Sequence, residues 1–144
     1  MPIMKTILFV EDDAVIVQAY RMGLERAGFR VEVAEDGLAA MKILLLLKPN
    51  LVLLDLMMPK LNGADVLKYI RSTPALKATP VIILSNASIA DLGQEAIALG
   101  ADRVFLKAQC TPRQLIGAAN ELLNSMVPSP QPAVPNGSAE LPPG

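Results

Sequence analysis

Short aliphatic segments alternate along the chain with longer segments in which apolar residues recur at helical spacing. This alternation is typical of a parallel β-sheet with helices on both faces, because parallel strands need long crossover connections. We therefore predict an α/β fold, (βα)5, with a doubly wound parallel sheet. The predicted strands span residues 6–10, 30–34, 51–54, 80–84 and 103–106, and the predicted helices span residues 14–27, 36–47, 63–72, 90–99 and 111–126.

The composition changes abruptly near the carboxyl terminus. Residues 128–144 contain six of the twelve prolines and a single charged residue, Glu140. Such a segment has too little apolar surface to fold by itself. We expect one domain over residues 1–127, followed at residues 128–144 by a disordered Pro-rich tail or the start of a linker.

Charge and composition exclude several classes of function. The formal net charge of −1 gives no basic field that would favour direct binding to nucleic acid or to an anionic membrane. The absence of histidine excludes a histidine base, a histidine metal ligand and a histidine kinase. No secretion signal or membrane-spanning stretch is visible, and the single cysteine fits a reducing compartment, so we expect a cytoplasmic protein.

Polar residues follow four of the five predicted strands. In an open parallel sheet, ligands bind outside the carboxyl ends of the strands, where the strand order reverses. Any one of these residues alone would be an ordinary turn residue, but their joint placement predicts a functional site. The residues are Glu11, Asp12 and Asp13 after the first strand, Asp55 after the third, Ser85 after the fourth and Lys107 after the fifth.

These residue types predict phosphoryl transfer to an aspartate. Neighbouring carboxylates repel one another unless a cation neutralises them, and Mg2+ is the hard cation that suits oxygen ligands of this kind. We expect Asp12 and Asp55 to bind Mg2+ directly and Glu11 to bind it through water. An ionised Asp55 can attack phosphorus without a general base. The Lys107 ammonium and the Ser85 hydroxyl would then contact the phosphoryl oxygens.

The same residues resemble those of the response-regulator receiver family of two-component signalling. Residues 7–13, ILFVEDD, are similar to the acidic first loop of that family. Residues 51–59, LVLLDLMMP, followed by Asn62 and Gly63, are similar to its phosphorylation segment. The resemblance covers about residues 4–126, which is nearly the whole predicted domain.

The resemblance implies a flavodoxin-like receiver fold with strand order 2-1-3-4-5. It implies phosphorylation by a sensor histidine kinase or a phosphotransfer protein. Because the segment after the domain is too short to bury a core, we expect a chemotaxis-type stand-alone receiver, although a fragment of a longer protein fits equally. The implied roles are an acid pair at Glu11 and Asp12, the phosphoacceptor at Asp55, a metal-binding backbone carbonyl at Met57, a switch hydroxyl at Ser85 and the lysine of the family at Lys107.

Three positions depart from the family pattern. Ala108 follows Lys107 where the family usually has proline, so we expect a trans peptide bond there. Val104 stands where the family usually has an aromatic switch residue, and Phe105 comes one position later. Because successive strand residues face opposite sides of the sheet, we expect Phe105 to pack in the core. Asn86 follows Ser85 where a small residue is usual, which predicts an altered hydrolysis rate.

Two alternative functions remain open at this point. An aspartate-dependent phosphohydrolase needs a second acid two residues after its nucleophile, and that position is Met57, so we expect no dedicated enzyme. A degenerate receiver that binds partners without phosphorylation is the other alternative, because Val104 and Ala108 depart from the family. For a phosphorylated receiver, we expect an unknown output protein to dock on the fourth helix, fifth strand and fifth helix, whose roots lie at Ser85 and Lys107.

Overall fold

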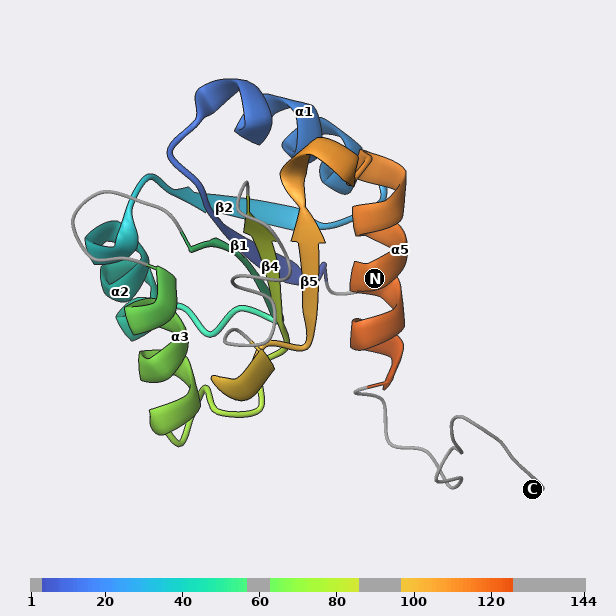
Figure 1. Ribbon diagram of the computed structural model, residues 1–144. Helices are drawn as coiled ribbons and strands as arrows, with labels where there is room; N and C mark the ends of the chain where they lie inside the picture. The colour runs from blue at the N-terminus through green and yellow to red at the C-terminus, as the bar shows by residue number, and fades with distance from the viewer. Residues whose placement is uncertain (1–3, 57–62, 86–96, 126–144) are drawn as a thin grey trace.

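The computed structural model describes residues 4–56, 63–85 and 97–125. From β1 to β4, strands and helices alternate along these residues, as the hydrophobic pattern predicts (Figure 1). A single turn of 3-10 helix, η1, follows the last strand. The elements are β1 (Thr6–Val10), α1 (Ala14–Arg26), β2 (Arg30–Ala34), α2 (Gly37–Leu46), β3 (Leu51–Asp55), α3 (Gly63–Ser72), β4 (Val81–Ser85), β5 (Arg103–Leu106), η1 (Lys107–Gln109) and α5 (Pro112–Ser125).

The five strands form one parallel sheet in the order β2-β1-β3-β4-β5. This order confirms the predicted doubly wound α/β fold. The strand order reverses at β1, which lies between β2 and β3, so the connections leave the sheet in opposite directions from that point. A crevice for ligands is therefore expected beside the carboxyl ends of β1 and β3.

The observed boundaries match the predicted ones for β1, β2, β5 and α3 and differ by one residue in the other described strands and α-helices. Asp55 and Ser85 are the last residues of β3 and β4, whereas the prediction placed them just after those strands. The strand β4 begins at Val81, because Pro80 has no N–H to donate to a ladder. Most of the predicted fourth helix lies outside the described residues, as do Met57, Asn86 and the segment 128–144.

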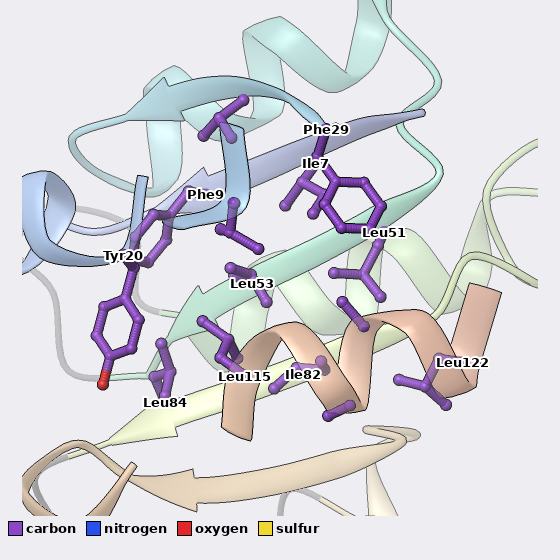
Figure 2. Packing of buried hydrophobic residues seen from close by; sticks show 14 of the residues in the cluster. Ile7, Phe9, Tyr20, Phe29, Leu51, Leu53, Ile82, Leu84, Leu115 and Leu122 are labelled. Carbon is purple, nitrogen blue, oxygen red and sulfur yellow. The ribbon is translucent and has the colours of Figure 1, made fainter. Parts of the chain in front are cut away.

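Alternating side chains of the strands divide the core into two layers. One layer contains Phe9, Leu53 and Leu84 and packs against α1 and α5 (Figure 2). The other contains Leu8 and Leu54 and packs against α2 and α3. Every residue of β3 and β4 is buried, as expected for parallel strands that are covered on both faces. No described helix is long and apolar enough to cross a bilayer.

Polar side chains at the helix starts satisfy backbone donors that have no partner within the helix. Asp13 accepts hydrogen bonds from the backbone N–H groups of Val15 and Ile16 at the start of α1. Thr111 and Gln114 form a reciprocal capping pair at the start of α5. These caps fix where each helix leaves the carboxyl edge of the sheet.

A single guanidinium, that of Arg71 on α3, connects the segments that precede β4 and β5. Its Nε donates to the carbonyl of Gly100 at 2.9 Å, and its Nη1 donates to the carbonyls of Lys77 and Thr79 at 3.1 and 2.6 Å. Its Nη2 pairs with the Asp102 carboxylate at 3.0 Å. The planar fork of arginine supplies all these donors from fixed directions, which a lysine ammonium does not.

We predict that Arg71→Lys lowers the free energy of unfolding by about 2 kcal/mol, because it leaves several backbone carbonyls without their donors. Urea unfolding followed by circular dichroism measures the change. The matched control is Arg21→Lys, which alters an exposed pair with Glu25 and is expected to change stability by less than about 0.5 kcal/mol. Equal effects of the two variants would contradict the role given to Arg71.

A second prediction concerns Gly63, the first residue of α3. A Cβ atom added there would lie 2.3 Å from the carbonyl oxygen of Asp55 and 2.6 Å from the Cα of Leu56. Because both are backbone atoms, Gly63→Ala is expected to lower the free energy of unfolding by about 2 kcal/mol. Gly117→Ala on α5, where nothing lies within 4 Å, is expected to raise it by about 0.5–1 kcal/mol. The same sign for both substitutions in urea unfolding would contradict this interpretation.

Candidate functional site

The candidate site lies at the carboxyl edge of the sheet, where residues far apart in the sequence come together. Glu11 directly follows β1, and its backbone N–H donates to the carbonyl of Ala34 at the end of β2 at 2.9 Å. Asp55 is the last residue of the neighbouring strand β3. The side chains of residues 11 and 55 therefore enter the crevice from adjacent strands, where the strand order reverses.

Three carboxylates converge in this crevice. One oxygen each of Glu11, Asp12 and Asp55 lies within 4.8 Å of the other two. Glu11 and Asp55 are 1% and 2% exposed, whereas Asp12 is exposed to solvent. The cluster is therefore buried on one side and open to water on the other, which is the arrangement that an exchangeable cation requires.

The side chain of Lys107 reaches two of these carboxylates. Its Nζ lies 2.7 Å from Oε1 of Glu11 and 2.9 Å from Oδ2 of Asp55. The lysine side chain is only 6% exposed. Since Lys107 is the first residue after β5, its side chain must cross above β4 to reach Asp55 on β3.

The charges in this cluster depend on one another. Burial raises the pKa of Glu11 above its ordinary value, and the Lys107 ammonium opposes that change. Burial favours the neutral amine of Lys107, but the contacts with Glu11 and Asp55 outweigh this effect and raise the pKa of the lysine. Lys107 therefore remains a cation at neutral pH and stabilises the buried carboxylates.

The same cluster has the composition of a Mg2+ site. Among the described residues, three carboxylates outnumber the one ammonium that contacts them by two formal charges, which a divalent cation would balance. The buried Oε1 of Glu11 has the ion-pair contact with Lys107 but no hydrogen bond of good geometry among the described residues. It can therefore accept from a metal-bound water, so the residues present fit the predicted ion.

The structure brings together most of the residues that the sequence predicted for the site. Ser85, 1% exposed, ends β4 beside β3, in register with Leu106, the residue before Lys107. Asp13 belongs to the same acidic run but caps α1, while its N–H donates to Oε2 of Glu11 at 3.0 Å. The predicted contributions of Met57 and Asn86 fall outside the described residues.

Two expectations for the positions that depart from the family pattern are confirmed, namely the packing of Phe105 and the trans bond before Ala108. Phe105 is half-buried and packs against the core layer on the α1 and α5 side. Val104 packs against the layer on the α2 and α3 side. No cis peptide bond occurs among the described residues, which include the bond between Lys107 and Ala108.

One contact near the site was not predicted from the sequence. The Tyr20 hydroxyl of α1 donates a hydrogen bond to the backbone carbonyl of Cys110, three positions after Lys107. The two residues are 90 positions apart, and the helical pattern indicates only that Tyr20 lies on an amphipathic helix. A buried tyrosine usually has a hydrogen-bond partner, but the sequence alone does not identify it.

Comparison with known proteins agrees with this geometry. The response regulator receiver domain family matches residues 7–120. The probable transcriptional regulatory protein SilR of Salmonella typhimurium is 33% identical over 138 residues, which cover 94% of this chain and 59% of SilR. The chain thus spans about half the length of the curated relatives that it matches.

Two solved structures of response regulators are similar to this fold. The Mn2+-bound form of Rcp1 has a TM-score of 0.74 and 28% identity, covering 88% of this chain and 99% of Rcp1. The phosphorylated cyanobacterial phytochrome response regulator RcpA has a TM-score of 0.76 and 27% identity, covering 90% of this chain and all of RcpA. Together with the family match, these similarities show that the chain belongs to the response regulator receiver domain family.

Proposed function

We propose that this chain is a phosphoacceptor receiver that is phosphorylated on Asp55 by a sensor histidine kinase or a phosphotransfer protein. The observation that carries the proposal is the cluster of Glu11, Asp12 and Asp55 beside the ammonium of Lys107. Receiver domains are signalling modules rather than dedicated enzymes, so the phosphorylated aspartate serves as a signal. The phosphorylated relative RcpA supports the same assignment by similarity.

Each residue of the cluster has a distinct role in the proposed reaction. A carboxylate oxygen of Asp55 attacks the phosphorus, and the bond between phosphorus and the donor's histidine nitrogen breaks. The Lys107 ammonium then moves from the Asp55 carboxylate to a phosphoryl oxygen, where negative charge accumulates. The Ser85 hydroxyl, at the neighbouring strand end, donates to another phosphoryl oxygen.

Glu11, Asp12 and Asp55 are the described residues that would hold Mg2+, and the Met57 carbonyl is a further proposed ligand. When bound, the ion would supply positive charge to the phosphoryl group. The Mn2+-bound relative Rcp1 supports a divalent-cation site in this family. Asp12, as the exposed member of the cluster, leaves the site open to exchange with solvent.

Output is proposed to occur by altered docking rather than by chemistry in this domain. Ser85 and Lys107 lie at the ends of β4 and β5, so a phosphoryl group would change the contacts at the roots of β5 and α5. The proposed docking surface comprises β5, α5 and the predicted helix at residues 90–99. We place the receiver domain at residues 1–127 and assign no docking role to residues 128–144.

The first test of this function is the incorporation of labelled phosphate. With radiolabelled acetyl phosphate and Mg2+, the wild type is expected to acquire an alkali-labile label, and Asp55→Asn is expected to acquire none because it lacks the nucleophile. Asp65→Asn, an exposed aspartate on α3, is the matched control and should label like the wild type. Absence of label on the wild type would overturn the proposed function and favour a phosphorylation-independent interaction module.

A second test concerns the metal. We expect Asp12→Asn to weaken Mg2+ binding by about tenfold or more, because it removes one of three clustered carboxylates. Isothermal titration calorimetry with MgCl2 on unphosphorylated protein measures the affinity, and labelling with EDTA present should fall to background. Asp13→Asn is the control, because asparagine still caps α1 and residue 13 lies outside the cluster. Equal losses in the two variants would contradict the assigned ligands.

A further inference from the structure

The position of the Lys107 ammonium depends on the backbone that follows β5. The edge strand β5 and strand β3 are two strand spacings, or about 10 Å, apart, and the side chains of Lys107 and Asp55 meet between them. The Lys107 side chain has little spare length to compensate for a shift of its own backbone. The conformation of residues 107–111 therefore decides whether the ammonium reaches the phosphoacceptor.

This loop is held at both of its ends. On one side, Leu106 is paired with Ser85 in the sheet. On the other, Thr111 caps α5 together with Gln114. Between them, Ala108 is an exposed residue in the position where the receiver family usually has proline, so this chain lacks that backbone constraint.

A hydrogen bond from another helix fixes the middle of the loop. The hydroxyl of Tyr20 on α1 donates to the carbonyl of Cys110. Tyr20 is 6% exposed, and its ring meets Phe9 edge-to-face, with centroids 6.1 Å apart and an interplanar angle of 77°. Figure 2 shows the two rings side by side, with the hydroxyl pointing away from Phe9. Phe9 lies on β1 two residues before Glu11, and Cys110 lies three residues after Lys107. Tyr20 therefore contacts the segments that carry both of these charged residues.

The hydroxyl of Tyr20 keeps its proton over the whole physiological range. Burial is the main cause that raises the pKa of Tyr20 to about 12. The side chain is thus a permanent donor to the Cys110 carbonyl. The ring packing and the hydrogen bond are separable, since phenylalanine would keep the first and lose the second.

We propose that Tyr20 is a positioning residue for phosphoryl transfer, which holds Lys107 in reach of Asp55 by fixing the carbonyl of Cys110. The role in transfer rests on the proposed function, whereas the positioning of the ammonium does not. The contact between Tyr20 and Cys110 acts through Lys107 and touches neither the phosphoryl group nor the metal site.

The experiment is a double-mutant cycle on the rate of labelling by acetyl phosphate at saturating Mg2+. Tyr20→Phe is expected to slow labelling about fivefold, the effect of one hydrogen bond. In a Lys107→Met background, the same substitution is expected to change the rate less than about twofold, because no ammonium remains to be positioned. Tyr69→Phe on α3, in the opposite core layer, is the control and should label like the wild type.

Equal effects of Tyr20→Phe in the two backgrounds would mean a merely structural role and would overturn the proposal, as would wild-type rates for that variant. A second readout does not need phosphorylation. In 15N NMR of the unphosphorylated protein, the buried Lys107 ammonium should give a signal with slow proton exchange, which Tyr20→Phe weakens. An unchanged signal would overturn the positioning role. A weakened signal, with no label on the wild type, would leave that role standing and reject only the proposed function.

Discussion

The ammonium of Lys107, held between two buried carboxylates, is the interaction on which the carboxyl edge of this sheet depends. Glu11 and Asp55 are almost completely buried, and a buried carboxylate without a partner is strongly unfavourable. Lys107 supplies the counter-charge at 2.7 and 2.9 Å. Asp12 adds a third carboxylate that faces solvent, so the cluster retains an excess of negative charge on its open side. The stability of this edge and the proposed affinity for a divalent cation thus depend on the same charges.

The sheet makes this cluster possible, because the three buried groups come from strands that do not follow one another in the chain. β1 and β3 are neighbours although β2 separates them in the chain, and β5 lies two strands away from β3. Alternating side chains from these strands fill two separate core layers. A slip of one residue in any strand would exchange the layers and turn apolar residues away from their helices. The same packing that buries the core therefore aligns the strand ends.

The sequence predicted the sheet and most of the site, because both depend on local signals. Aliphatic runs with polar residues at their ends locate the strands to within about a residue, and the strand-end rule gathers Glu11, Asp55 and Lys107. The contacts made by Arg71 and Tyr20 could not be predicted. They join residues as far as 31 and 90 positions apart, and each depends on the exact approach of two packed segments. The 3-10 turn after β5 could not be predicted either, because its three residues are too few to carry a periodic pattern.

The side chains of β5 point to opposite core layers, and this arrangement affects how the loop after Lys107 is held. Val104 faces α2 and α3, and Phe105 faces α1 and α5, so moving the aromatic by one position transfers it to the other core layer. No aromatic of β5 then remains on the side of α2 and α3. The aromatic that contacts the loop after Lys107 comes from α1 instead, through the hydroxyl of Tyr20. The acidic residues of the cluster resemble those of the family motif, whereas the backbone after Lys107 is tied to α1. Lys107 is thereby linked through Cys110 to α1, which packs with α5 on the same face of the sheet.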